Sequence, residues 1–247
     1  FGYFFTRNWE EAMKLNRRVA VLSPDENWNH LSKTFILFGD KGANDLSLKT
    51  IRKVTIRSWS LFSIMHQYFY TKQYDSLIDT IQNYPEGIDS KGNYMPADLI
   101  TGMAYQFKGM PNEAKSAFER ALRHIQEQIM KNEMDDRLYS SLGMTYALLG
   151  EKEKAIEAGK KAMDYLPRSK NAFYGIQPAL DMAHIYAFLG MDDECVVLLE
   201  DILSKPGHFH PKWLEQDPRF DSIKDHPKYP DLISQPLSQQ YQINPPN

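Results

Sequence analysis

An aromatic position recurs along the chain every 32 to 41 residues, in a similar frame of apolar and small residues each time. The six aromatic positions are Tyr3, Phe35, Tyr68, Tyr105, Tyr146 and Tyr186. Self-similarity at a period of this length is typical of arrays that stack one small structural unit many times. The repeat therefore restricts the fold more than any other feature of the sequence.

The unit around Tyr146 predicts a pair of antiparallel helices. Gly143 and Tyr146 share one helix face, where they form a notch beside a ring. Gly150 follows, and glycine lets a helix end in a left-handed turn without steric cost. The next apolar stripe has small residues at Ala155 and Ala162, which let two helices approach closely, and a proline at 167 stops the second helix. Such a pair cannot bury its own stripe, so neighbouring pairs must stack.

This pattern resembles the tetratricopeptide repeat family, over about residues 1–207 and best between Pro96 and Pro167. The resemblance implies an all-α, right-handed superhelical solenoid of antiparallel helix pairs, and a role in protein–protein interaction. The chain departs from the family pattern at Gly159, where a large apolar residue is usual. It also departs at Asn44 and Leu77, which replace a small alanine.

We expect residues 1–207 to form the repeat array, with a first repeat that is truncated. Residues 84–96 are expected to form a loop, 113–131 one long second helix, and 169–178 an inserted loop. The chain opens at Phe1 without a starting methionine, which suggests a piece of something longer.

Residues 208–233 are expected to form a short helical cap over the last exposed face of the stack, because they carry apolar residues among X-Pro steps. Residues 234–247 are expected to be a flexible tail. The Trp-Leu, Asp-Pro-Arg-Phe and His-Pro-Lys-Tyr steps of the cap resemble the tail of such arrays in bacterial multidomain regulators. In those proteins the array accompanies a cyclase, kinase, winged-helix or TolB-like domain.

Composition excludes several classes of protein. The 29 basic and 32 acidic side chains give a formal charge of −3, which argues against a nucleic-acid partner. No apolar run approaches the roughly 18 residues of a membrane span. We therefore expect no membrane insertion, and a cytoplasmic location is favoured over a periplasmic one without being decided.

The chain offers little chemistry for an enzyme, and we expect no catalytic residue, cofactor or metal. His208 and His210 near Asp217 resemble part of a zinc site, but a Pro-rich cap that packs on the last helix explains them better. Cys195 occupies the small packing position of its repeat. The acidic clusters at 135–136 and 192–194 precede or begin predicted helices, where acids cap free N–H groups.

We expect the first helix of each pair to line a concave groove that binds a protein or peptide partner. The predicted groove residues are Lys33, Trp59, Phe62, His66, Phe69, Met103, Gln106, Phe107, Arg137, Met144 and His184. Because most are apolar or aromatic, an amphipathic peptide or helix fits this groove better than a chaperone-tail carboxylate does.

The sequence leaves open whether these aromatic residues are exposed or covered by the 84–96 loop. A regulatory domain that senses a small molecule and relays the signal to an upstream enzyme or DNA-binding domain is the alternative function. Self-association through an open edge of the stack is a further interaction that the sequence leaves open.

Overall fold

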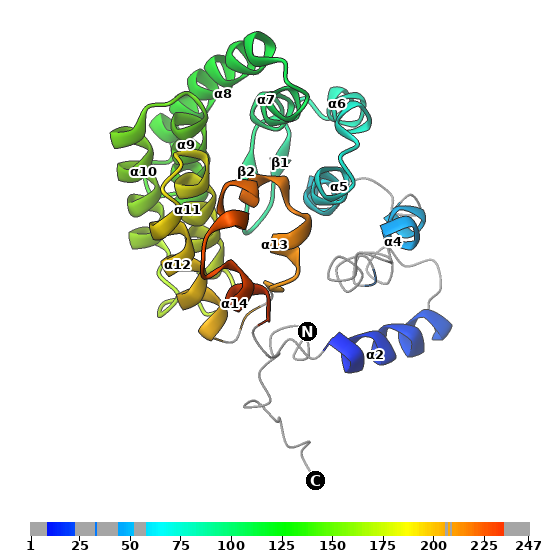
Figure 1. Cartoon of the computed structure of the whole chain (residues 1–247). Coiled ribbons are helices and arrows are strands. Elements are labelled where there is room, and N and C mark those ends of the chain that lie inside the picture. The colour runs from blue at the N-terminus through cyan, green and yellow to red at the C-terminus, as the bar shows by residue number, and fades with distance from the viewer. Residues whose placement is uncertain are drawn as a thin grey trace.

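The computed structural model describes residues 9–22, 33, 44–51, 58–205, 207 and 209–234, and nearly all of the secondary structure within them is helical. The main array consists of four consecutive helix pairs that stack into a curved solenoid (Figure 1). These pairs are α5 (Ser58–Tyr70) with α6 (Tyr74–Gln82), α7 (Ala97–Phe107) with α8 (Pro111–Lys131), α9 (Asp136–Leu148) with α10 (Lys152–Tyr165), and α11 (Ile176–Phe188) with α12 (Asp192–Ser204). The predicted all-α solenoid is confirmed.

Other helices flank this array at both ends. Helices α2 (Trp9–Leu22) and α4 (Asn44–Ile51) precede it, and Ser47 of α4 donates a hydrogen bond to Gln67 of α5, with Oγ and Oε1 2.5 Å apart. After α12 come α13 (Trp213–Gln216), the 3-10 segment η2 (Pro218–Asp225) and α14 (Tyr229–Ser234). The predicted anchors Tyr3 and Phe35, and the predicted tail beyond Ser234, lie outside the described residues.

The turn between paired helices follows the sequence prediction. Gly109, Gly150 and Gly190 have φ angles of 75°, 80° and 66°, in the left-handed region that glycine adopts without strain. In the pair α5–α6 the equivalent turn is made by Lys72, with φ of 55°. The turn geometry is therefore kept even where the glycine of the repeat is missing.

The unusual Gly159 gives the last pair room to pack. A Cβ atom at this position would lie 2.5 Å from Met182 Sδ and 2.8 Å from Ile185 Cδ1. A Cβ atom at Gly143 would likewise lie 2.6 Å from Ile185 Cδ1. Ile185 of α11 thus enters a hole between α9 and α10 that small residues create, which explains the departure from the family pattern.

Ala155 provides a direct test of this close packing. We expect Ala155→Leu to lower the free energy of unfolding by about 1–3 kcal/mol, because Ala155 is fully buried and Leu would overpack the contact of α9 with α10. Urea unfolding followed by circular dichroism measures the change. Glu157→Leu on the exposed side of α10 is the matched control, and equal losses in both variants would contradict the packing argument.

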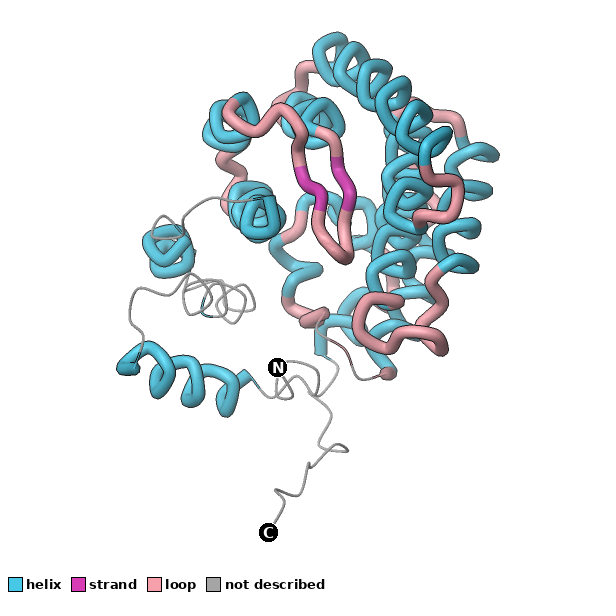
Figure 2. Tube along the Cα trace, turned by 180° about the vertical axis from the view of Figure 1, so that it is seen from behind, coloured by secondary structure: helices cyan, strands magenta, loops and turns pink. Residues whose placement is uncertain are grey.

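The segment 84–96 is not simply the loop that its proline and glycine residues predict. It contains an antiparallel hairpin in which β1 (Ile88–Asp89) pairs with β2 (Tyr94–Met95), shown in magenta in Figure 2. Ile88 and Met95 are directly paired and buried, β1 packs on α5 and β2 on α9. Ser141 of α9 donates a hydrogen bond to the carbonyl oxygen of Tyr94. The hairpin therefore connects the two helices across the array.

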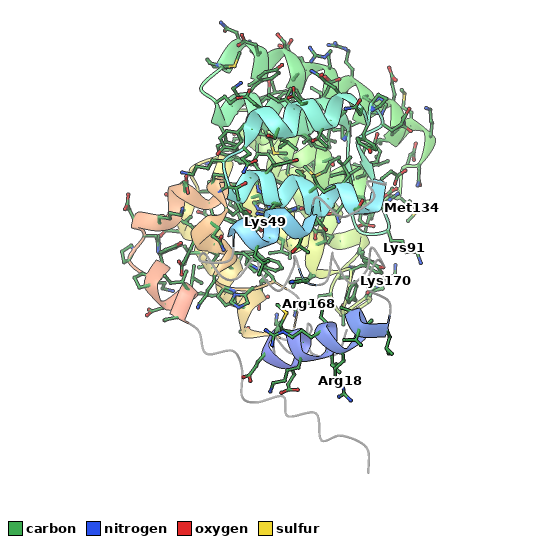
Figure 3. The ribbon with its side chains drawn as sticks, turned by 90° about the vertical axis from the view of Figure 1, so that its right-hand side faces the viewer. Arg18, Lys49, Lys91, Met134, Arg168 and Lys170 are labelled. Carbon is green, nitrogen blue, oxygen red and sulfur yellow. The ribbon has the colours of Figure 1, made fainter. Side chains whose placement is uncertain are left out.

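The long helix predicted at 113–131 and the loop predicted at 169–178 can also be compared with the structure. Helix α8 is one long helix of 21 residues, as predicted. The predicted loop at 169–178 ends earlier, because α11 begins at Ile176 and Asn171 Oδ1 accepts hydrogen bonds from two backbone N–H groups in the preceding turn. Figure 3 shows Lys91 at the hairpin turn and Lys170 in this loop near the same edge of the molecule. The hairpin turn and this loop are in close contact, because a Cβ atom at Gly92 would lie 3.2 Å from a ring carbon of Tyr174.

The C-terminal segment, residues 209–234, does more than cover the last pair. It packs on α11 and α12, as a cap would. It also lies within the curve of the array (Figure 1), where the Arg219 guanidinium carbon is 5.6 Å from the ring centroid of Phe69 on α5. The segment therefore connects the last pair of helices to the first helix of the main array.

Candidate interaction site: the concave face

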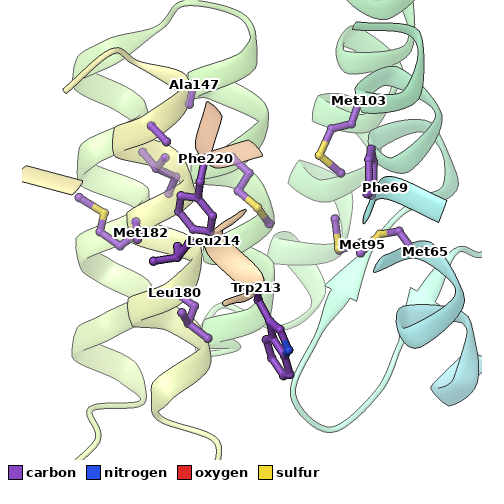
Figure 4. Close-up of a cluster of buried hydrophobic side chains, with 14 of the residues drawn as sticks. Met65, Phe69, Met95, Met103, Ala147, Leu180, Met182, Trp213, Leu214 and Phe220 are labelled. Atoms are coloured by element: carbon purple, nitrogen blue, oxygen red, sulfur yellow. The ribbon is translucent and has the colours of Figure 1, made fainter. Parts of the chain in front are cut away.

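The first helices of the pairs, α5, α7, α9 and α11, face the inside of the curve (Figure 1). The C-terminal segment lies there, with η2 packed on α11 and Arg219 over the ring of Phe69 on α5. Figure 4 shows Leu214 and Phe220 of the segment between Met182 on one side and Phe69 and Met103 on the other. All of these side chains are buried and belong to one apolar cluster. The concave face therefore binds a non-repeat segment of the same chain.

Aromatic contacts fix the position of this segment. Phe220 is fully buried and stacks on His184 of α11, with ring centroids 4.4 Å apart. Phe209 packs edge-on against Trp213 at 5.6 Å and lies 6.4 Å from Phe220. These rings supply a large buried area and a defined geometry, which are the usual features of an anchor in a protein interface.

A charged pair is buried beside these rings. Arg219 donates to Asp217 from Nε to Oδ1 at 2.8 Å and from Nη2 to Oδ2 at 2.6 Å. Asp217 Oδ1 also accepts a 3.0 Å hydrogen bond from the backbone N–H of Arg219, so the same carboxylate caps η2. Burial by itself raises the pKa of Asp217, but Arg219 and His184 outweigh it and hold that pKa well below its usual range.

Several titratable groups of the array face this pair, namely His184, His66, Asp181 and Tyr70. Burial lowers the pKa of His184 to about 4, with Arg219 adding to the effect and Asp217 opposing it. Burial and Arg219 lower the pKa of His66 to about 3, while its Nδ1 forms a 2.8 Å hydrogen bond with the carbonyl oxygen of Phe62. Burial raises the pKa of Asp181 to about 6, although Gln177 Nε2 donates to it at 2.9 Å. The two histidines are therefore neutral at pH 7.

These shifts predict that the protein loses stability as the pH falls below about 6.5. His66 and His184 bind a proton in the unfolded chain near that pH, but in the folded chain only near pH 3 and 4, so acidification favours unfolding. Asp181 acts in the opposite direction between pH 6 and 3.8 and offsets part of the loss. We expect a net loss on the order of 2–3 kcal/mol between pH 7 and 4.5.

Urea unfolding at several pH values measures this loss, and His184→Phe is the matched variant because its ring cannot titrate. The variant should show a shallower dependence on pH than the original chain. Identical slopes for the two proteins would contradict the role of His184.

The structure places the predicted groove residues in several different environments. Phe69, Met103, Met144 and His184 are buried in the cluster that includes the C-terminal segment. The half-buried residues are Lys33, Phe62, His66 and Phe107, whereas Gln106 is exposed. The side chain of Trp59 lies outside the described residues.

Arg137 is engaged in holding the hairpin. It donates to Asp135 from Nε at 2.9 Å and from Nη2 at 2.6 Å, and its Nη1 lies 2.7 Å from Asp89 Oδ1 in β1. These bonds occupy the guanidinium, so its role in the structure is to join α9 to the hairpin. Asp135 caps α9 as predicted, since its carboxylate accepts from the backbone N–H of Arg137 at 3.0 Å.

Phe69, one of the predicted aromatic groove residues, is covered by other side chains of the protein. The ring of Phe69 lies 5.7 Å from Phe107, 6.1 Å from Tyr74 and close to Arg219 of the C-terminal segment. The segment covers this part of the face together with the hairpin, which packs on α5. Asp217, Arg219 and Phe220 are occupants of the face that the sequence pattern did not predict. The signal for them was a charged pair placed among the apolar residues of the cap.

The other chemical candidates have structural explanations. Cys195 is buried, its Sγ lies 3.3 Å from the carbonyl oxygen of Ala183, and burial raises the pKa of its thiol to about 12. His210 Nδ1 accepts a hydrogen bond from the backbone N–H of Lys212, and Asp217 is bound by Arg219, while His208 lies outside the described residues. Within the described ranges, no three His, Cys, Asp or Glu residues are grouped as metal ligands.

Comparison with known proteins agrees with this architecture. The tetratricopeptide repeat model matches residues 101–123 and 136–166, which cover most of α7 to α10. No curated protein matches the chain.

None of the described helices has the length and apolar character needed to span a membrane. Tetratricopeptide repeats are in general non-catalytic modules that bind other proteins. The matched residues coincide with paired helices of the structure, so the part from α7 to α10 is similar to tetratricopeptide repeats in both sequence and architecture.

Proposed function

We propose that this chain is a protein-interaction scaffold whose concave face binds a peptide or a helical segment of a partner. The observation that supports this most directly is the burial of residues 209–234 on that face. A surface that buries Trp213, Leu214 and Phe220 of one segment has the shape and the apolar character to bind another segment of similar chemistry.

The array is suited to this task because its helix pairs stack one after another along a curve (Figure 1). Each helix pair contacts the next, α6 with α7, α8 with α9 and α10 with α11, so α5, α7, α9 and α11 follow one another along the concave side. We propose that residues 1–207 form the array and residues 208–233 the segment that binds to it, followed by a tail at 234–247. The surroundings of Phe69 are filled by side chains, which favours a peptide ligand over a small molecule.

The experiment uses a chain in which the C-terminal segment can be released. A protease site is inserted after Lys205, an exposed residue that follows α12, and the purified protein is cut without loss of any residue. A fluorescently labelled peptide of residues 209–234 is then added, and its anisotropy is measured. We expect the peptide to exchange into the face of the cut protein and to raise the anisotropy.

Circular dichroism of the cut protein is the control for folding. A cut protein that keeps its helical signal but binds no peptide would contradict the proposal. A cut protein that unfolds when the segment leaves would also contradict it, because the segment would then be part of the core.

We further propose that the chain works within a larger bacterial regulatory or signalling protein. The support for this is the resemblance of the segment from Trp213 to Tyr229 to the tail of arrays in such regulators. Self-association is a second proposal, supported by Leu15, Val19 and Leu22, which lie along one side of α2 and are exposed. Light scattering at increasing protein concentration tests it.

A further inference from the structure

The C-terminal segment fits the concave face imperfectly at His184. The side chain of His184 is only 7% exposed, and its Nε2 lies 3.7 Å from Asp217 Oδ2, beyond hydrogen-bonding distance. Neither ring nitrogen has a hydrogen-bond partner within the described part of the chain. A buried polar group without a partner is unfavourable, because it has lost its hydrogen bonds to water. A segment with a better-placed acidic group would therefore have an advantage over the resident one.

The face also offers different surroundings to the two charged groups of the segment. Arg219 lies over the ring of Phe69 and interacts electrostatically with Tyr70 on α5 and Asp181 on α11. The negative face of an aromatic ring and a nearby carboxyl group both favour a cation. The region beside His184 instead offers an imidazole to a carboxylate. The face therefore favours a segment that places an acidic group near His184 and a cation over the ring of Phe69.

The acid and the arginine form an element that a short peptide can carry by itself. Asp135 and Arg137 at the start of α9 make the same three hydrogen bonds as Asp217 and Arg219, with the carboxylate binding both the backbone N–H and the guanidinium two residues later. In η2 these bonds are at 3.0, 2.8 and 2.6 Å. The same Asp-x-Arg turn therefore forms in two different surroundings within the chain.

We propose that residues 209–234 are a displaceable occupant of the concave face, and that this face selects partner peptides with an aspartate, an arginine two residues later and an aromatic residue directly after it. The proposal rests on the proposed function and specifies its ligand. Asp217, Arg219 and Phe220 show the pattern in the resident segment. Because the segment is tethered, its effective concentration is on the order of millimolar, so it competes with any partner and sets the affinity that a partner must have.

The test compares peptides of residues 212–225 on the intact chain and on the chain cut after Lys205. The first peptide has the native sequence. The second has the same composition with Asp217→Arg and Arg219→Asp, and the third has Lys212→Ala at an exposed position as a matched control. On the cut chain we expect the charge-exchanged peptide to bind at least about tenfold more weakly than the other two. On the intact chain all three should bind at least about tenfold more weakly than on the cut chain.

The outcomes separate this inference from the proposed function. Equal affinities for the native and charge-exchanged peptides would overturn the inference but leave a peptide-binding face. Equal affinities on the intact and cut chains would show that the segment does not compete. No binding by a cut chain that remains folded would contradict the proposed function itself. An intact chain that forms an exchanged dimer in light scattering, and excludes the native peptide, would assign the face to a second copy and overturn the inference.

Discussion

Arg219→Met is expected to lower the free energy of unfolding by about 3–5 kcal/mol, one of the two largest effects that we predict for a single substitution. The change removes both guanidinium hydrogen bonds from Asp217, whose side chain is only 2% exposed. The carboxylate would then be buried with the backbone N–H of residue 219 as its remaining donor in this pair. Urea unfolding at pH 7, followed by circular dichroism, measures the loss.

A double variant separates the charge from the packing. Asp217→Asn combined with Arg219→Met removes the uncompensated charge, so we expect it to recover most of the stability lost in Arg219→Met. The defect of the single variant should also shrink at lower pH. Without the guanidinium, burial favours the neutral form of Asp217 and only His184 opposes it, so the pKa of Asp217 is higher than in the original chain and the folded variant binds the proton more readily. A loss below 1 kcal/mol in the single variant would show that the pair is not buried as described.

Phe220→Ala is the second substitution with a large expected effect, also about 3–5 kcal/mol. Phe220 is fully buried, stacks on His184 and belongs to the same apolar cluster as Phe69 and Met103. Its truncation leaves a cavity between the C-terminal segment and the concave face. Urea unfolding measures the loss, and the fluorescence of Trp213 in the same segment should change at a lower urea concentration than in the original chain.

Phe173→Ala is the matched control because this phenylalanine is 38% exposed. We expect it to change the free energy of unfolding by no more than about 0.5 kcal/mol. Similar losses in the two phenylalanine variants would mean that Phe220 does not anchor the segment.

The helix pairs could be predicted from the sequence because their causes are local. The spacing of Gly143 and Tyr146 marks one helix face, and Gly150 ends the helix in the left-handed turn that the structure shows. The hairpin at 88–95 was missed for the opposite reason. Its strands have two residues each, too few for an alternating pattern, and they are held by Ser141 and Arg137 of a helix that follows later in the chain.

Only those residues of the candidate site that belong to the helix pairs could be predicted from the sequence. Helical periodicity places Phe69 and His184 on the inner side of their helices, and both are found there. Nothing in the pattern around Asp217 and Arg219 shows that these residues reach α5. That contact spans about 150 residues of sequence and depends on the curvature of the whole array.

By itself the sequence determined the helix pairs, their turns and the apolar stripe along which they stack, because these depend on residues within one repeat. Only the tertiary structure decided that the concave face is occupied, and by which segment. The physical reason is that each stacking angle is set by side-chain packing such as that of Ile185 between Gly143 and Gly159. These small angles accumulate until the face of α5 and the last helices are close enough for one segment to contact both.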